Sequence, residues 1–266
     1  SNNSKESIIN DQVGLEIIGS KKKLSDDKEI INTILKSIDK IKIKNVSINI
    51  GDVSLFRQLI DSLNMPERWK LRLIRHFWRP KYFEDLLNRL ETNSDIDPIT
   101  VDFDKKKFSE MKKLNQNQEI AGRKISEILS RFDKKIRDPR SFAEGKKTAK
   151  IIREFLKISC PIDQMDKNLN KFFKKNNIKK NIIKNLLPMK NLSKSDYKII
   201  FSTNFGRDIE YYTGMVFDIW ASANKNKQEI ARGGRYDNLL KSLGSKKDVS
   251  AVGAAINLNN LSRLMQ

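Results

Sequence analysis

Residues 209–222, IEYYTGMVFDIWAS, and residues 228–240, QEIARGGRYDNLL, decide the fold of this chain. Alternating apolar side chains fill the first stretch, and the second runs to a double glycine. The segment ANKNK at 223–227 is typical of a turn, so the pattern predicts a β-hairpin over 210–232, with the two tyrosines in its first strand. A double glycine at a strand end indicates backbone that turns tightly or lies close to another group.

Strand patterns occupy both ends of the chain, whereas residues 54–190 show helical periodicity and no convincing strand. We therefore expect an α+β fold with a helical insertion. Three parts are predicted: residues 1–52 as the first part of the core, 53–196 as the insertion, and 197–266 as the second part. The expected core elements are strands at 8–18, 46–50, 197–205 and 249–257 and a helix at 24–40.

The chain has 266 residues, with 53 basic and 33 acidic side chains, and a formal net charge of +20. Such a charge favours polyanionic partners. Its lysines are scattered among Asn and Ile, however, unlike the clustered arginines and aromatics of a nucleic-acid surface, so we expect no nucleic-acid partner. The single cysteine, Cys160, excludes an intramolecular disulfide, and the default expectation is a cytoplasmic location. No apolar run is long enough to span a bilayer, and no signal peptide is visible, so no membrane segment is expected.

Several kinds of catalytic site are excluded by the residues present. The chain has no P-loop, no GxGxxG, no HExxH and no metal-spaced Cys/His cluster. His76 is the only histidine, which excludes histidine-based triads and multi-histidine metal sites. We expect no catalytic residue, no metal and no cofactor.

Two groups of polar residues are candidates for a ligand site. Gln12 and Glu16 would lie on the same face of a strand, about 13 Å apart. A buried carboxylate there needs a partner such as a substrate ammonium group, although a solvent-facing pair is the simpler alternative. Arg207 can bind a carboxylate or phosphate through two hydrogen bonds, and Tyr212 offers a hydroxyl. An aromatic pair with charges at its rim is the alternative.

Four segments resemble the histidyl-tRNA synthetase family. GRDIEYYTGMVFD (206–218) and EIARGGRYDNLLKSLG (229–244) resemble its two histidine-binding motifs, and DQVGLEIIGS (11–20) resembles the end of class II motif 2. SAVGAAINLNNL (250–261) occupies the place of motif 3. The resemblance implies a class II aminoacyl-tRNA synthetase-like antiparallel sheet flanked by helices. It also implies a histidine-like pocket lined by Gln12, Glu16, Arg207, Ile209, Tyr211, Tyr212, Gly233, Gly234, Arg235 and Tyr236.

The motif 3 segment departs from that of a synthetase. The family's arginine that grips the ATP phosphates is replaced by Asn260, while Asn257 and Asn259 replace a glycine and an acidic residue. A short neutral side chain cannot offer a bidentate cation to a phosphate. We also expect no anticodon-binding domain. Motif 1 would lie before Ser1, which is not a Met, so we expect the chain to lack its natural N-terminal part or to carry a tag remnant.

This pattern resembles the catalytically silent branch of the family, the regulatory subunits of ATP phosphoribosyltransferase, and residues 51–90 strengthen the resemblance. It implies a non-enzymatic subunit that self-associates as a dimer, joins a short-form catalytic subunit in a hetero-octamer and takes part in feedback by free L-histidine. It also implies that Gln12 and Glu16 face the amino group, Arg207 the carboxylate, and Tyr212 and Tyr236 the imidazole. The alternatives are a divergent aminoacylating enzyme and a basic RNA-binding module, whose affinity would fall steeply with salt.

Overall fold

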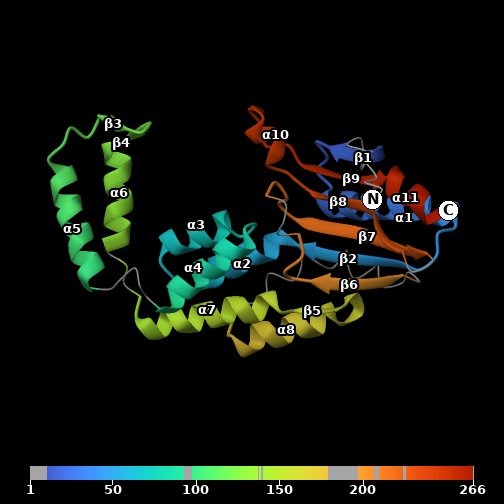
Figure 1. The fold of residues 1–266 in the computed structure, drawn as a ribbon, viewed down its shortest axis with the longest axis horizontal. Helices are drawn as coiled ribbons and strands as arrows, with labels where there is room; N and C mark the ends of the chain where they lie inside the picture. The colour runs from blue at the N-terminus through green and yellow to red at the C-terminus, as the bar shows by residue number, and fades with distance from the viewer. Residues whose placement is uncertain are drawn as a thin grey trace, which may run out of the picture. The chain divides into compact units, whose positions relative to one another are not determined.

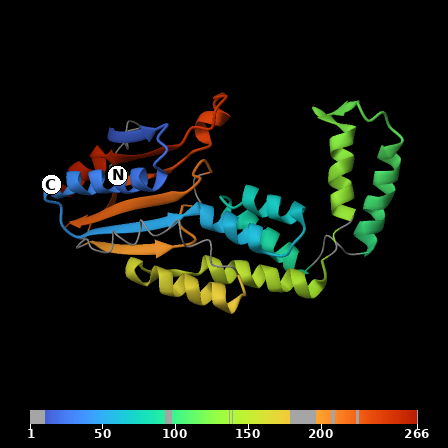
Figure 2. The ribbon, with the colours of Figure 1, turned by 180° about the vertical axis from the view of Figure 1, so that it is seen from behind.

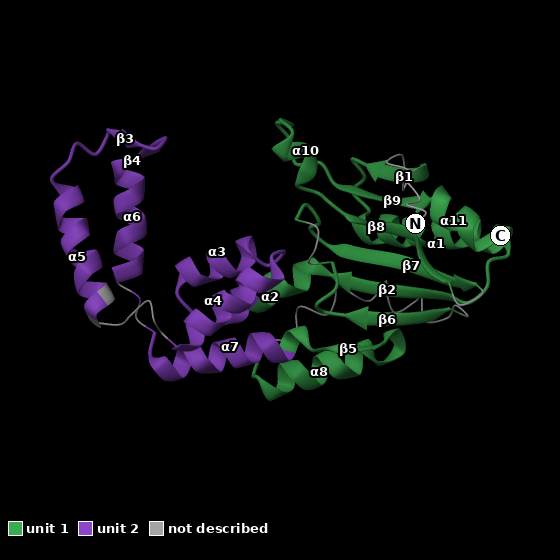
Figure 3. Cartoon of the chain, in the orientation of Figure 1, with its two compact units in different colours: residues 1–59, 155–266 green, residues 60–154 purple. Residues whose placement is uncertain are grey.

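The structure is a computed structural model that describes residues 11–92, 98–136, 138, 140–178, 197–206, 210–223 and 226–265. The chain forms two compact units (Figure 3). Unit 1 contains residues 1–59 and 155–266, and unit 2 contains residues 60–154. We describe each unit by itself.

Unit 1 is built on a seven-stranded sheet with the strand order β1-β9-β8-β7-β2-β6-β5 (Figure 1). Its strands are β1 (Gln12–Ile18), β2 (Val46–Asp52), β5 (Ser159–Pro161), β6 (Lys198–Ser202), β7 (Met215–Ala223), β8 (Asn226–Arg235) and β9 (Ala251–Asn257). Only β2 and β6 pair in parallel, and all the other neighbours are antiparallel. The predicted α+β class is therefore confirmed.

One face of this sheet is covered by helices α1 (Lys23–Ile41) and α11 (Leu258–Met265), which contact β9 and β8 (Figure 2). Helix α1 packs through the stripe that its helical period predicts. The stripe consists of the buried residues Ile30, Ile31, Ile34, Leu35 and Ile38. Alternation along the strands turns Ile48, Phe217 and Ile256 toward the same helix face, where they complete an apolar core.

The opposite face of the sheet is more polar, and we call it the open face. It carries the half-exposed side chains of Ser47, Asn49, Trp220, Arg232, Ala255 and Asn257. Asp218 is buried within it and accepts a hydrogen bond from Asn49 Nδ2 at 2.7 Å. A sheet with one face buried and one face accessible is thus in place to support a ligand.

The remaining helices of unit 1 lie at the ends of the sheet. Helix α8 (Met165–Lys175) follows a short 3₁₀ turn and contacts β5, while α10 (Leu239–Ser242) follows β8. Helix α2 (Val53–Ser62) begins directly after β2, at the boundary with unit 2. The Asp52 side chain caps α2, because its Oδ1 accepts the Ser54 amide at 2.8 Å.

Unit 2 is mainly helical. It contains α3 (Glu67–Arg75), α4 (Pro80–Thr92), α5 (Pro98–Lys112), α6 (Ile125–Ile136) and most of α7 (Phe142–Leu156), together with the two-stranded hairpin β3 (Glu119–Ile120) and β4 (Arg123–Lys124). Arg153 of α7 ties this helix to α4 through Glu84 at 2.8 Å and Glu91 at 2.7 Å. Trp69 of α3 is fully buried.

Several sequence expectations were wrong in detail. The segment 54–190 contains β3, β4 and β5, because strands of two or three residues carry too little periodicity to detect. Strand β7 begins at Met215, so Tyr211 and Tyr212 precede the strand instead of belonging to it. Residues 8–10 of the first expected strand lie outside the described residues.

No helix in the described part of the chain combines the length and apolar character that a membrane crossing requires.

Candidate ligand pocket

The segment with the two adjacent tyrosines and the segment with the double glycine meet through Thr213. Its amide donates to the Arg235 carbonyl at 2.8 Å, and its Oγ1 accepts the Asp237 amide at 3.0 Å. The Tyr236 amide in turn donates to Ala251 O at 2.8 Å on β9. These bonds hold the segment before β7 against the end of β8, so the two stretches separated by a hairpin form one site.

The floor of the site is a pair of glycines on neighbouring strands, Gly234 on β8 and Gly253 on β9, which lie opposite each other in register. A Cβ on Gly234 would lie 2.7 Å from Tyr212 Cε1, and a Cβ on Gly253 would lie 2.7 Å from Glu16 Cγ. Both distances are shorter than a real contact. Glycine is therefore required at both positions for the ring and the carboxylate side chain to lie on the sheet.

Glu16 and Tyr236 form the polar side of the site above Gly253. The point that a Gly253 Cβ would occupy lies 2.7 Å from Glu16 Cγ and 3.0 Å from the Tyr236 hydroxyl oxygen. That hydroxyl is buried and lies beside the Glu16 carboxylate, without a well-formed hydrogen bond among the described residues. Burial, the Glu16 carboxylate and Tyr211 raise the pKa of Tyr236, so the hydroxyl is a protonated donor at neutral pH. A buried hydroxyl without a well-formed hydrogen bond is costly, and a ligand would satisfy it.

Three tyrosine rings form the aromatic side of the site. The Tyr211 ring lies 4.7 Å from that of Tyr212 and 6.0 Å from that of Tyr236, measured between centroids. The second pair is edge-to-face, with an interplanar angle of 87°. These are favourable aromatic geometries. We call Glu16, Tyr211, Tyr212 and Tyr236 with the floor glycines Gly234 and Gly253 the tyrosine pocket; Gly253 was missed by sequence reasoning.

Four predicted residues do not form the surface of this pocket: two lie near it, and two lie outside the described residues. Gln12 is exposed on β1, where it pairs with Asn257 of β9, four residues along the chain from Glu16. Gly233 faces the helix side, where a Cβ would lie 2.5 Å from Ala254 Cβ, so it permits close approach of two strands. The predicted residues Arg207 and Ile209 lie outside the described residues.

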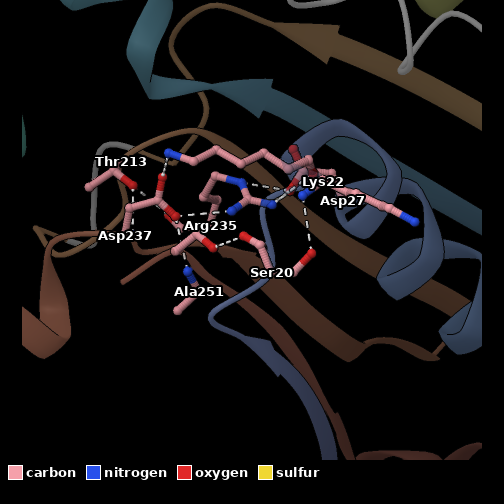
Figure 4. Close-up of polar contacts among 9 residues, drawn as sticks. Ser20, Lys22, Asp27, Thr213, Arg235, Asp237 and Ala251 are labelled. Carbon is pink, nitrogen blue, oxygen red and sulfur yellow. Dashed lines mark hydrogen bonds and ion pairs between the residues drawn. The ribbon is translucent and has the colours of Figure 1, made fainter. Parts of the chain in front are cut away.

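Arg235 also lies on the helix side of the sheet, opposite the pocket. Its Nε donates to Asp27 Oδ1 at 2.8 Å, its Nη1 to Asp237 Oδ1 at 2.9 Å and its Nη2 to the Lys23 carbonyl at 2.8 Å (Figure 4). The side chain is buried. The Arg235 guanidinium therefore does not reach the tyrosine pocket. It joins β8 to the start of α1 instead.

Asp237 extends this network on its other side. Its Oδ2 accepts Lys23 Nζ at 2.6 Å, and its Oδ1 accepts the Ala251 amide at 3.0 Å (Figure 4). Burial alone would raise the pKa of Asp237, but hydrogen bonds from Lys23, the Ala251 amide and Arg235 lower this pKa below its usual value. Burial raises the pKa of Asp27 despite its bond to Arg235. Sequence reasoning missed Asp27 because it lies 208 residues from Arg235.

Two asparagines of the motif 3 segment form hydrogen bonds with the backbone of this chain. Asn257 caps α11 by accepting the Asn260 amide on its Oδ1 at 2.9 Å. Asn260 Nδ2 donates to the Glu229 carbonyl at 2.8 Å, which links α11 to β8. At the position of the family's phosphate-binding arginine, this chain thus has an amide that supports the sheet. No group of three or more His, Cys, Asp or Glu side chains in the described ranges is arranged to hold a metal ion.

Comparison with known proteins identifies the family to which this chain belongs. The family model described as histidyl-tRNA synthetase matches residues 2–261, and the chain belongs to that family. It is also similar to two proteins named ATP phosphoribosyltransferase regulatory subunit. The protein from Brucella anthropi is 25% identical over 96% of this chain and 72% of its own length. The protein from Rhizobium rhizogenes is 24% identical over 94% of this chain and 71% of its own length.

A solved structure supports the fold. It is that of an ATP phosphoribosyltransferase regulatory subunit/histidyl-tRNA synthetase from Bacillus halodurans, with a TM-score of 0.56 and 17% identity. The match covers 96% of this chain, which spans 53% of the length of that protein. The class II synthetase-like fold expected from the motifs is confirmed.

Proposed function

We propose that this chain is a regulatory subunit of ATP phosphoribosyltransferase, without catalytic activity of its own, that a short-form catalytic subunit requires in the first step of L-histidine biosynthesis. The observation that carries the proposal is Asn260. Its side chain serves the sheet at the position where a synthetase needs a cation for the ATP phosphates. The names of the relatives from Brucella anthropi and Rhizobium rhizogenes support the same role. Action in the cytoplasm, dimerisation and assembly into a hetero-octamer belong to this proposal.

The partner prediction is tested by mixing. Adding this chain to a short-form catalytic subunit should raise phosphoribosyl transfer from phosphoribosyl pyrophosphate to ATP at least about tenfold, because the subunit shifts its partner toward the active conformation. The two chains should co-elute in size-exclusion chromatography. No rate gain and no co-elution would refute the proposal. Histidine-dependent pyrophosphate exchange with ATP by this chain alone would favour an aminoacylating enzyme.

We further propose that the tyrosine pocket binds free L-histidine. The Glu16 carboxylate would accept the ligand ammonium group, because it is exposed on the open face over Gly253 and the described residues of the tyrosine pocket include no cation. The Tyr236 hydroxyl would donate to a ring nitrogen, and the Tyr212 ring would pack against the imidazole. Gln12 and Arg207 remain proposed contacts for the amino and carboxylate groups.

Changing Tyr236 to Phe separates ligand binding from folding. Tyr236→Phe should weaken L-histidine binding about 3- to 10-fold in calorimetry, the value of one neutral hydrogen bond. It should change the free energy of unfolding by less than about 1 kcal/mol, because the buried hydroxyl lies beside Glu16 without a well-formed hydrogen bond. Glu16→Gln should weaken binding about 10- to 100-fold.

The matched control is Tyr82→Phe, which removes the hydroxyl of an exposed tyrosine in unit 2 and should change neither quantity. Wild-type affinity in Tyr236→Phe and Glu16→Gln would exclude the tyrosine pocket as the binding site.

A further inference from the structure

The network around Arg235 lies directly beneath the tyrosine pocket, on the other face of the same strands. Gly234 supports the Tyr212 ring on the open face, and the next residue, Arg235, points to the helix face. Tyr236 follows immediately and reaches back to Glu16. Three consecutive residues thus connect the pocket floor, the buried ion pairs and the pocket wall. A displacement of the Arg235 backbone is therefore passed directly to Gly234 and Tyr236, to which it is joined by peptide bonds.

The same network also fixes the other side of the pocket. Thr213 bonds to both the Arg235 carbonyl and the Asp237 amide, and it directly follows Tyr212. A Cβ on Gly214 would lie 3.1 Å from Arg235 Cδ, so the backbone after Thr213 lies against the arginine side chain. Both tyrosines that contact the floor glycines are therefore attached to one buried cluster.

Charge makes this cluster depend on α1. Arg235 is 6% exposed, and Asp27 of α1 is the carboxylate that meets it through two nitrogens, at 2.8 Å from Nε and 2.6 Å from Nη2. The second carboxylate, Asp237, is shared with Lys23 of α1. A buried guanidinium that loses such a partner has to reorganise or recruit another. The N-terminal end of α1 therefore supplies both a carboxylate, Asp27, and a cation, Lys23, to the network.

We propose that Asp27 is a positioning residue for the tyrosine pocket, acting through Arg235 without touching the ligand. Helix α1 thereby sets the geometry of Tyr212 and Tyr236, and a change at Asp27, near its N-terminus, changes ligand affinity across the sheet. The effect on L-histidine affinity rests on the proposed function. The effect on the tyrosine rings does not, because it follows from the bonds within the chain.

The experiment uses the full chain labelled with ¹³C in its tyrosine rings. Its five tyrosines give few resonances, and Tyr212→Phe and Tyr236→Phe assign the two that matter. Asp27→Asn keeps the size of the side chain but removes its charge, so the Tyr212 and Tyr236 resonances should shift. Those of Tyr82 and Tyr197 should stay in place. L-histidine affinity should fall about tenfold, and Asp27→Glu should recover part of it because the carboxylate is restored.

Asp248→Asn is the matched control, because it breaks an exposed ion pair with Lys241 in the same unit and should change neither resonances nor affinity. Arg235→Lys, which keeps the charge but not the forked donors, should reproduce the effect of Asp27→Asn. Unmoved Tyr212 and Tyr236 resonances in both variants would overturn the inference, even if thermal stability falls. Shifted resonances in a chain that binds no L-histidine would uphold the positioning role and reject the proposed ligand.

Discussion

Replacing Asp138 with Ala should destabilise unit 2 by about 3–5 kcal/mol, the cost of removing one partner of a buried ion pair. The Asp138 side chain is fully buried, and its Oδ2 accepts Arg68 Nη2 at 2.6 Å, Arg68 Nε at 3.2 Å and Trp69 Nε1 at 2.9 Å. Its Oδ1 accepts the Arg140 amide at 3.2 Å. One carboxylate therefore accepts four hydrogen bonds and joins two segments of unit 2, around Arg68 and around Arg140.

Cations around Trp69 explain why the loss is large. The guanidinium carbons of Arg68, Arg72 and Arg140 lie 5.3, 5.3 and 4.3 Å from the centroid of this buried ring. Cation–π attraction favours each contact, but the three positive charges also repel one another. Asp138 is the carboxylate that the described contacts place among them. Without it, less of this repulsion is offset.

The measurement is urea unfolding followed by the fluorescence of Trp69 in a Trp78→Phe/Trp220→Phe background, where Trp69 is the sole tryptophan. Asp138→Asn keeps an oxygen for Trp69 Nε1 and should lose less than Asp138→Ala. Asp102→Ala, which removes an exposed ion pair of the same unit, should change stability by less than about 1 kcal/mol. Equal midpoints for Asp138→Ala and Asp102→Ala would contradict the prediction.

Long periodic segments explain how much of the fold the sequence could predict. The apolar stripe of α1 and the alternation of β7 are local patterns, and both were identified correctly because each repeats over several turns or residues. Strand β5 has three residues and pairs with β6, which lies about forty residues further along the chain. Its strand geometry comes from that partner, so no local pattern could reveal it.

The site was predicted only in part, because some of its features have local sequence signals and others depend on contacts between distant segments. The double glycine indicated close approach, and the structure supplies the groups that approach: Ala254 at Gly233 and Tyr212 at Gly234. The direction of Arg235 followed from strand alternation, since adjacent residues of β8 face opposite sides of the sheet. Including it among the pocket residues overlooked that rule. Asp27 carried no local signal, because its role depends on a contact between distant segments.

Asp52 gives the second large effect, with the opposite sign: Asp52→Asn should stabilise unit 1 at pH 7 by up to about 3 kcal/mol. Burial raises the pKa of Asp52 from 3.8 to about 6, against the hydrogen bond from Ser54, and the neighbouring Asp27 raises it further. The folded state therefore binds more protons than the unfolded chain between pH 4 and 6. Stability falls as the pH rises through this interval and stays lowered above it.

Asparagine removes the charge and keeps the cap, because its side-chain oxygen can still accept the Ser54 amide that begins α2. Urea unfolding of the wild type and Asp52→Asn from pH 4 to 8 should show similar stability near pH 4 and a gap that opens toward pH 6. Asp52→Ala should gain about 1 kcal/mol less than Asp52→Asn, because it loses the capping oxygen. A wild type more stable than Asp52→Asn at pH 7 would mean that the ionised Asp52 is stabilised by its surroundings, and that the buried charge next to Asp27 carries no cost.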